Sequence, residues 1–407
     1  MAFGKKEQKR ECAICNNSFT ELGGMLWNGK RVCSACENRL RVMYSQSTPK
    51  TDYEEAVEVA REAEREAKRK RLLTSIKNPK EIKQLLDQYV VGQDAAKEVM
   101  AVAAYNHYKR LDINHEGSKT DSEVVVEKSN ILMIGPTGCG KTHIVKSLAK
   151  VLDVPFAVAD ANSLTEAGYV GSDVESILVS LYRNADKDID KAAMGIVFID
   201  EIDKLVSQRG AERMVGGKGV QQGLLKILEG TDAVLNLPGP NGAKEEFVID
   251  TSNILFICGG AFEGLENIIA DREGVEKCAS FKSVKDEDLV KFGLIPEFVG
   301  RLPVLTTLNN MTADMLVKVL TEPKNALLKQ YVELFKYDGI ELSFEEDAIR
   351  AIAERAVARN RGARALRFEM EAVLNPYMFQ LPGGNYKKVM FTREAVEGRG
   401  VPYMEEG

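Results

Sequence analysis

The chain has 407 residues, of which 44% are apolar and 29% charged, and its formal net charge is −6. This composition is typical of a globular protein with room for two or three domains, and the net acidity argues against a surface that coats nucleic acid. The sequence has no run of about 18 apolar residues and no apolar stretch near its start, so we expect neither a membrane span nor a secretory signal, and predict a cytoplasmic location.

Four cysteines near the N-terminus have the spacing of a zinc site. Cys12 and Cys15 form one pair, and Cys33 and Cys36 form a second pair with the same spacing. Two such pairs let four thiolates converge on one Zn²⁺ in a tetrahedron, which leaves no open position for a catalytic water. Two disulfides are the alternative, but they require an oxidising compartment. The sequence therefore predicts a structural zinc module over residues 1–48 that depends on its metal for folding.

A charged segment follows at 49–75. The stretch KTDYEEAVEVAREAEREAKRKR is dominated by Glu, Ala, Lys and Arg, and Glu64 and Lys68 are spaced for an i,i+4 ion pair. We expect a solvated helical or semi-rigid linker, although the basic run at 68–71 leaves a nucleic-acid contact open. Helical apolar periodicity begins soon afterwards, so a large domain is predicted from residue 76.

A phosphate-binding loop is predicted next. The β-type run NILMIG leads into GPTGCGKT and then into the helical pattern HIVKSLAKVL, which is the context that a P-loop requires. Backbone N–H groups and the helix N-terminus hold phosphates, Lys141 neutralises them, and the Thr142 hydroxyl binds Mg²⁺. We therefore expect ATP and Mg²⁺ as cofactors. The predicted cofactor-binding residues of the loop are Gly135, Pro136, Thr137, Gly138, Cys139, Gly140, Lys141 and Thr142.

The stretch AGYVGSDVE contains an apolar pair between two glycines. Tyr169 and Val170 lie between Gly168 and Gly171. One interpretation is a tight turn whose tyrosine folds onto the core. The other is a displayed pair to which the glycines give freedom of movement. The residues alone leave both open.

A second acidic motif completes the predicted nucleotide site. In GIVFIDEIDK, four apolar residues at 196–199 predict a buried parallel strand that ends in Asp200 and Glu201. Carboxylates at the carboxyl end of a strand face the phosphate crevice. Asp200 would hold Mg²⁺ and Glu201 would polarise the attacking water, which predicts a hydrolase rather than a passive nucleotide binder.

Two arginines in the C-terminal half are candidate phosphate sensors. Arg301 lies in PEFVGRLP, where it would project from a turn, and Arg364 begins a helix in RNRGARALR. One could sense the γ-phosphate of its own subunit, and the other could reach a neighbour's nucleotide as an arginine finger. Taken alone, either arginine is more often a surface ion-pair residue.

Further motifs accompany these and decide between the classes of P-loop protein. In chain order, the four cysteines are followed by VVGQDAAKEVMAVAAYNHYKRL, GPTGCGKT, GYVGSDVE, FIDEIDK, LLKILEGT, LFICGGAF, KFGLIPEFVGRLP and GARALR. This combination resembles the ClpX family of AAA+ protein unfoldases over nearly the whole chain. The resemblance implies an α/β fold with a parallel-sheet large subdomain at 76–311 and a small, mainly helical subdomain at 312–407.

The resemblance also implies a function. Members of the family use ATP to unfold protein substrates, which they thread through the pore of a homohexameric ring, and their zinc module dimerises and recruits adaptors. The family motifs identify Asp200 and Glu201 as Walker B residues, Arg301 as the trans-acting finger and Arg364 as the sensor-2 arginine. Glu201, Arg301 and Arg364 are therefore the predicted catalytic residues.

Two further sites follow from the resemblance alone. Val91 and Gly92 resemble the motif that lines the adenine pocket. The segment 168–171 resembles the pore loop, in which Tyr169 and Val170 grip the substrate by apolar contacts that require no particular partner sequence.

The chain also departs from the family pattern. Family members carry an Ile-Gly-Phe tripeptide that docks on the ClpP peptidase, and the corresponding interval at 263–287 has none. Where family members carry a basic pore-entrance loop, this sequence has DAVLNLPGPNGAKEE, which contains a single basic residue, Lys244. The sensor-1 position cannot be identified, because its strand ends in Cys258 and Gly259. We therefore expect protein substrates and consider ClpP a doubtful partner.

A second hypothesis uses the same ATPase core on a different substrate. In it, the chain is a zinc-ribbon ATPase that remodels nucleic acid or nucleoprotein. Tyr169, Val170 and the acidic net charge favour protein substrates, whereas an ATPase that is salt-sensitive and stimulated by nucleic acid would favour this alternative.

Overall fold

The computed structural model describes residues 9–11, 18–20, 25–27, 30–32, 66, 70, 76–117, 124–164, 174–206, 217–238, 244–276, 281–359 and 361–407. The chain divides into two compact units, Met1–Lys70 and Arg71–Gly407. The described strands of the first unit form two antiparallel hairpins: β1 (Lys9–Glu11) with β2 (Ser18–Thr20), and β3 (Met25–Trp27) with β4 (Lys30–Val32).

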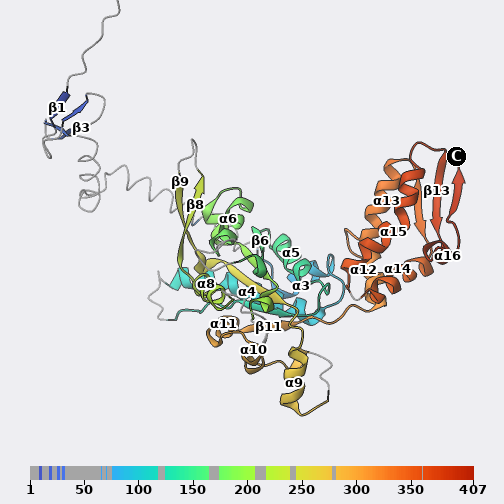
Figure 1. Ribbon diagram of the computed structural model, residues 1–407, viewed down its shortest axis with the longest axis horizontal. Helices are drawn as coiled ribbons and strands as arrows, with labels where there is room; N and C mark the ends of the chain where they lie inside the picture. The colour runs from blue at the N-terminus through green and yellow to red at the C-terminus, as the bar shows by residue number, and fades with distance from the viewer. Residues whose placement is uncertain are drawn as a thin grey trace, which may run out of the picture. The chain divides into compact units, whose positions relative to one another are not determined.

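A five-stranded parallel sheet forms the centre of the second unit (Figure 1). Its order is β11-β5-β10-β7-β6. The bounds are β5 (Ile131–Ile134), β6 (Phe156–Asp160), β7 (Ile196–Asp200), β10 (Leu255–Gly260) and β11 (Val304–Thr307). Parallel neighbours need crossover connections, so helices cover the faces and the carboxyl ends of all the strands meet at one edge.

Alternate side chains of the central strands enter two separate cores. Ile131 and Met133 of β5 belong to the first core, whereas Leu132 and Ile134 belong to the second, and β7 and β10 alternate in the same way. The first core also contains α3 (Pro79–Asp87), α4 (Asp94–Gly117) and α5 (Lys141–Leu152). Because both faces of the sheet are buried, the sequences of these strands are continuous apolar runs.

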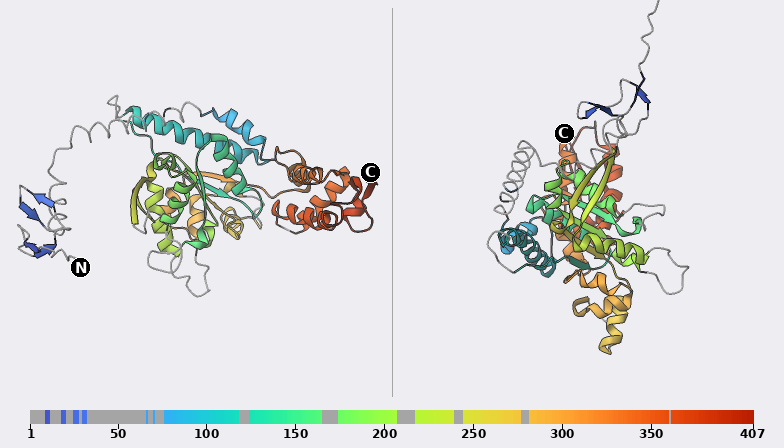
Figure 2. Two further views of the ribbon diagram at one scale, coloured as in Figure 1. Left: turned by 90° about the horizontal axis from the view of Figure 1, so that it is seen from above. Right: turned by 90° about the vertical axis from the view of Figure 1, so that its left-hand side faces the viewer.

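The second core contains the remaining helices of the sheet domain. Figure 2 shows the blue helices α3 and α4 on one side of the sheet and the green helices on the other. Its elements are η1 (Ala161–Ser163), α6 (Glu175–Asn184), α7 (Ile189–Ala193), η2 (Ile202–Leu205), α8 (Gly217–Glu229), the hairpin of β8 (Asp232–Pro238) and β9 (Lys244–Asp250), α9 (Leu265–Glu273), η5 (Phe281–Ser283), α10 (Asp286–Phe292) and α11 (Pro296–Gly300). The short helix η4 (Thr251–Asn253) joins β9 to β10.

A third core follows in the C-terminal region. Helices make up most of this region, and a three-stranded sheet of order β12-β13-β14 completes it. The elements are α12 (Ala313–Thr321), α13 (Leu327–Tyr337), β12 (Glu341–Phe344), α14 (Glu346–Ala358), α15 (Arg364–Gln380), β13 (Tyr386–Phe391), α16 (Arg393–Val396) and β14 (Tyr403–Glu406).

The sequence sets where the helices near the site begin. Asn78 caps α3 by accepting a hydrogen bond from the Glu81 N–H at 3.1 Å, and Thr312 caps α12 through the Met315 N–H at 3.2 Å. Helix α5 differs, because it begins after Gly140 without a side-chain cap. Its first N–H groups are therefore not occupied by a capping side chain.

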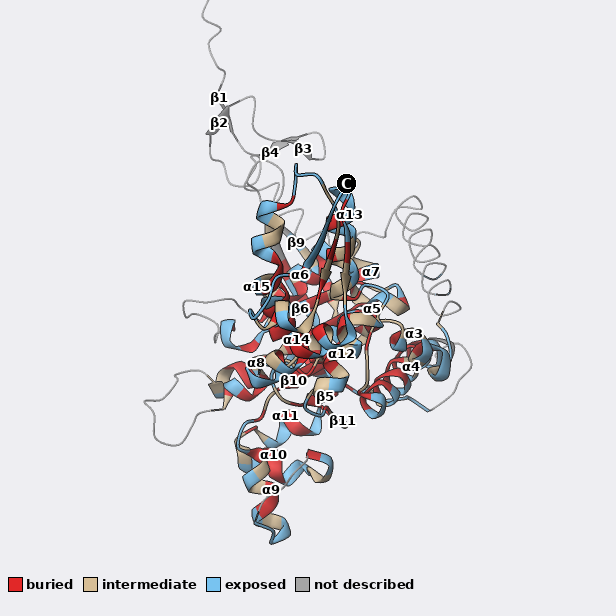
Figure 3. Cartoon of the chain, turned by 90° about the vertical axis from the view of Figure 1, so that its right-hand side faces the viewer, coloured by how far each residue is buried: buried red, intermediate tan, exposed pale blue. Residues whose placement is uncertain are grey.

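Buried residues are concentrated in the sheet and on the helix faces turned toward it (Figure 3). Within the part of the chain that the structure describes, no helix combines the length and the apolar character needed to cross a bilayer.

Candidate nucleotide site

A cavity of about 360 Å³ lies where the strands of the parallel sheet end. Its walls come from the P-loop and the first turn of α5, the segments after β7 and β10, and the start of α15. The lining residues are Thr137, Gly138, Gly140, Lys141, Thr142, His143, Asp200, Glu201, Asp203, Lys204, Ala261, Glu263, Ala363 and Arg364. The carboxyl ends of parallel strands are where α/β folds bind their ligands.

The P-loop joins β5 to α5 and supplies one wall of this cavity. Gly138 (φ +79°) and Gly140 (φ +105°) have left-handed conformations that a side chain would disfavour. Lys141 is only 8% exposed, and its ammonium donates to the carbonyls of Gly135 at 2.6 Å and Pro136 at 3.3 Å. The loop thus combines a cation with an uncapped helix N-terminus, the arrangement that binds phosphate.

Some P-loop residues line a second cavity, which shares Thr137 with the first. Pro136, Thr137 and Cys139 line this cavity of about 470 Å³ with residues 307–311. The Cys139 thiol is buried, and this burial raises its pKa. Cys139 is therefore a packing residue rather than a reactive thiol.

Thr142 and Asp200 meet on the cavity wall. The Thr142 hydroxyl donates to Asp200 Oδ2 at 2.9 Å, although the two residues are 58 positions apart in the sequence. The other oxygen, Oδ1, accepts from the Glu201 N–H at 2.9 Å. The structure therefore brings together the hydroxyl and the carboxylate that were predicted to hold Mg²⁺.

Glu201 has a left-handed backbone conformation with φ +58°. Its carboxylate accepts a hydrogen bond from the Asn162 amide, which also donates to Asp160 Oδ1 at 3.1 Å. Asn162 lies in η1, directly after β6. Our sequence analysis missed this residue, because a lone asparagine after a strand carries no distinctive pattern.

The end of β10 is joined to the segment after β7. Asp203 is buried, and its Oδ1 accepts from the Ala261 N–H at 3.1 Å. A Cβ on Gly260 would lie 2.5 Å from this same carboxylate oxygen, so the approach requires glycine. Asp203 and Ala261, which our sequence analysis did not identify, therefore both lie on the cavity wall.

Arg364 enters the cavity wall as the first residue of α15. Just before it, the Ala363 N–H donates to the Gly138 carbonyl at 3.0 Å. Gly362 has φ +54°, and a Cβ there would lie 2.5 Å from the same carbonyl oxygen. The C-terminal region thus contacts the P-loop backbone directly.

Arg301 lies apart from this cavity. It follows α11, is 53% exposed, and pairs with Glu229 at 2.8 Å. It is not among the residues that line the cavity of its own chain.

Val91 and Gly92 lie in the segment between α3 and α4. They do not line the two cavities described above. Gly92 has φ +65°, and a Cβ there would lie 2.6 Å from Met315 Cε of α12. The adjacent Gln93 is buried, and its amide exchanges two hydrogen bonds with the Asn309 backbone, at 2.9 and 3.0 Å.

Two predicted sites lie outside the described residues. One is the zinc site, formed by Cys12, Cys15, Cys33 and Cys36. The other is the substrate pore loop, formed by Gly168, Tyr169, Val170 and Gly171.

Comparison with known proteins gives matches over both regions of the second unit. The family model "AAA domain (Cdc48 subfamily)" matches residues 126–305, and the model "C-terminal, D2-small domain, of ClpB protein" matches residues 311–386. The similar proteins include the ATP-dependent Clp protease ATP-binding subunit ClpX of Borrelia duttonii (strain Ly) and that of Borrelia recurrentis (strain A1). Each is 43% identical over 420 residues, which cover 97% of this chain and 93% of the relative. The resemblance predicted from the motifs is confirmed, and the chain belongs to the ClpX family.

Proposed function

We propose that this chain is an ATP-driven protein unfoldase that works as a ring of six copies. Membership of the ClpX family supports the assignment as an ATP-driven protein unfoldase. The observation that carries the proposal is the 2.9 Å hydrogen bond between Thr142 and Asp200, with Glu201 next to it and Lys141 and Arg364 on the same cavity wall. These are the groups that phosphoryl transfer to water requires.

The donor set fits ATP with Mg²⁺. Thr142 and Asp200 offer the hydroxyl and carboxylate oxygens that Mg²⁺ prefers, and the bound ion would neutralise phosphate charge. Lys141 and the N–H groups of α5 hold the phosphates. Glu201 orients the attacking water and accepts its proton.

Arg364 links hydrolysis to movement in this proposal. It would contact the γ-phosphate from the first turn of α15, a helix whose start bonds to the P-loop at Gly138. Loss of the γ-phosphate would remove one of these contacts, and the C-terminal region would then be free to shift relative to the sheet.

Arg301 acts in trans in this proposal. Its partner in the single chain is Glu229, and both side chains are about half exposed. An exposed ion pair of this kind contributes little, so the arginine can leave it at small cost when a neighbouring copy presents its nucleotide.

The N-terminal unit would be a zinc module that dimerises and recruits adaptors. Cys12 directly follows β1 and Cys33 directly follows β4 in the sequence, so each cysteine pair is next to a hairpin strand. We propose the module at 1–48 and the linker at 49–75. The sheet subdomain would span 76–311 and the small subdomain 312–407, and we place the protein in the cytoplasm.

The decisive experiment separates ATP hydrolysis from unfolding. Tyr169→Ala should leave ATP hydrolysis intact and abolish unfolding of a tagged fluorescent protein, because it removes the grip on substrate and leaves the nucleotide site unchanged. Tyr403→Ala on β14 is the control. Unfolding at the parent rate by Tyr169→Ala would refute the pore-loop assignment. Stimulation of the ATPase by nucleic acid instead of unfolded protein would favour the nucleic-acid alternative.

A further inference from the structure

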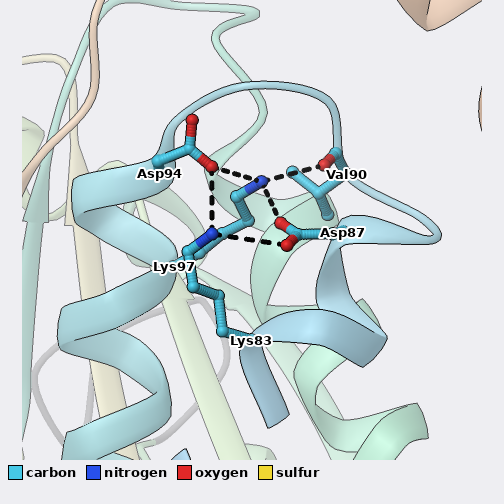
Figure 4. Close-up of polar contacts among 5 residues, drawn as sticks. All are labelled: Lys83, Asp87, Val90, Asp94 and Lys97. Atoms are coloured by element: carbon cyan, nitrogen blue, oxygen red, sulfur yellow. Dashed lines mark hydrogen bonds and ion pairs between the residues drawn. The ribbon is translucent and has the colours of Figure 1, made fainter. Parts of the chain in front are cut away.

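Two lysines and two aspartates form one cluster where α3 ends and α4 begins (Figure 4). Lys97 Nζ bonds to Asp87 Oδ1 and lies 3.0 Å from Asp94 Oδ1. It also donates to the Val90 carbonyl at 3.3 Å. Lys83 Nζ lies 3.3 Å from Asp87 Oδ2 and 3.3 Å from Asp94 Oδ1. The two ammonium groups thus lie between the same two carboxylates.

Lys97 is the buried member of the cluster, with 2% of its side chain exposed. An ammonium has three N–H donors, and Lys97 has three acceptors, from Asp87, Asp94 and Val90. Buried ion pairs are weak evidence for stability, because desolvation offsets the attraction. A fully satisfied buried cation therefore points to control of local conformation.

The acceptors of Lys97 bracket the segment 88–93. Asp87 is the last residue of α3, Val90 lies within the segment, and Asp94 is the first residue of α4. The segment ends in two left-handed residues, Gly92 at φ +65° and Gln93 at φ +57°. A non-glycine residue adopts this conformation only where the surroundings hold it.

Other contacts also hold the segment 88–93. The Gln93 amide bonds to the Asn309 backbone, and the Lys324 N–H donates to the Gln88 carbonyl at 3.0 Å. The His143 ring nitrogen Nε2 lies at hydrogen-bond distance, 3.1 Å, from the Tyr89 carbonyl oxygen. Lys97, a residue of α4, joins the Val90 carbonyl of this segment to Asp87 at the end of α3.

We propose that Lys97 is a positioning residue for the nucleotide base. By fixing the Val90 carbonyl between the ends of α3 and α4, it holds Val91 and Gly92 in the conformation in which they meet the base. The inference rests on the proposed function and on the assignment of Val91 and Gly92 to the adenine pocket, which the family resemblance implies. Lys97 itself would not touch the nucleotide.

The test compares Lys97→Met with Lys83→Met in the full chain. Both changes remove an ammonium from the same two carboxylates, but only the first removes the bond to Val90. The probes are ATP and inorganic tripolyphosphate, which has phosphates and no base. We expect Lys97→Met to raise the KM for ATP about tenfold while kcat stays within about twofold. Its inhibition constant for tripolyphosphate should not change, and Lys83→Met should change neither constant.

Several outcomes would overturn the inference. An unchanged KM for ATP would show that the segment keeps its conformation without Lys97. Equal weakening of ATP and tripolyphosphate would show a general disturbance of the site. If Lys97→Met does not fold, Lys97→Met with Asp87→Asn is measured in the same way, since it leaves the pair of Asp94 and Lys83. Failure of both variants to fold would assign Lys97 to the fold instead.

The proposed function is tested separately. If the parent chain hydrolyses ATP and Glu201→Gln does not, the function stands whatever the Lys97 variant shows. If the parent chain shows no ATP hydrolysis, the proposed function itself fails.

Discussion

Glu201 has a backbone conformation that few non-glycine residues adopt. Its φ of +58° lies in the left-handed region, which costs a residue with a side chain about 1 to 2 kcal/mol. Its carboxylate accepts a hydrogen bond from Asn162, which is itself bonded to Asp160. Strain of this kind persists where surrounding contacts hold it, and it concentrates at functional sites. Here the left-handed conformation and the hydrogen bond from Asn162 together place the Glu201 carboxylate on the wall of the cavity.

Glu201→Gln should keep ATP binding and lose turnover. The amide has the shape of the carboxylate but cannot accept a proton from water, so we expect kcat to fall by about 100-fold or more. Steady-state ATP hydrolysis and binding of a fluorescent ATP analogue measure the two effects. Turnover within a few-fold of the parent would contradict the assignment of Glu201.

Lys128 is a partly buried cation next to the helix η4. Its ammonium donates to the Thr251 carbonyl at 2.8 Å and lies 4.6 Å from the centre of the Phe256 ring. Desolvation and, to a smaller extent, the charge of Arg110 together lower the pKa of Lys128 to about 7, against the opposing effect of Asp250. Near neutral pH, Lys128 is therefore only partly protonated in the folded chain, whereas it is fully protonated in the unfolded chain.

This lysine should make the free energy of unfolding depend on pH. Between pH 7 and 10.5 the unfolded chain binds a proton that the folded chain lacks, so stability increases with pH in this range. From pH 7 to pH 9 we expect the free energy of unfolding of the parent to rise by about 2 kcal/mol relative to Lys128→Met. Urea denaturation of both proteins at the two pH values gives the comparison. Equal pH dependence in both would disprove the shift.

Two glycines bring the P-loop and the start of α15 into direct contact. A Cβ on Gly138 would lie 2.1 Å from the Arg361 carbonyl oxygen, and one on Gly362 would lie 2.5 Å from the Gly138 oxygen. Both residues also have positive φ angles. No side chain fits between these two backbone segments, so the contact requires glycine on both sides.

Gly362→Ala should separate α15 from the P-loop. We expect the KM for ATP to rise about tenfold or more, because the shift moves Arg364 away from the cavity and disturbs Gly138. Gly383→Ala is the matched control: it has a similar backbone penalty, with φ +79°, but nothing within 4 Å of the added Cβ. Steady-state ATP hydrolysis measures both. A similar loss in the control would show that the backbone conformation, and not the contact, is responsible.

The elements that could be predicted from sequence are those with a local signal. β5, α5 and β7 were predicted because apolar runs, a glycine loop and helical periodicity are readable within a few residues. Asn162 and Gln93 could not be predicted, because their partners Glu201 and Asn309 are 39 and 216 positions away. The sheet of β12, β13 and β14 was missed for the same reason. β12 pairs in parallel with β13, and helices α14 and α15 lie between the two strands in the sequence.

At the scale of the whole molecule, the zinc module is expected to act independently of the ATPase. Cys33→Ser removes one of four thiolates, and a domain this small depends on its metal for folding. We expect loss of bound zinc and unfolding of residues 10–45, with basal ATP hydrolysis within about twofold of the parent. Zinc content and ATP hydrolysis are measured on the same preparation. Aggregation of the whole chain would show that the module is needed by the ring.

The segment 263–287 is the interval in which the family resemblance predicts an Ile-Gly-Phe loop. Arg272 of α9 donates to both oxygens of Asp288 in α10, at 2.9 and 3.1 Å, and to the Ser283 carbonyl at 2.7 Å. Phe281 is buried in the second core, so it is not available as an external anchor. Among the described residues of this segment, Val275 is the large apolar side chain that is exposed, at 47%.

We predict that the chain unfolds proteins without feeding ClpP. A docking loop depends on a few apolar anchors that fill preformed pockets, and a ring multiplies the loss of each anchor through avidity. With ClpP from the same cell, degradation of an unfolded substrate should be slow, less than about a tenth of the rate given by the variant K277I/C278G/A279F, which restores the tripeptide. Rapid, ATP-dependent proteolysis by the unaltered chain that is lost in Val275→Ser would instead show that the short segment docks by its own residues.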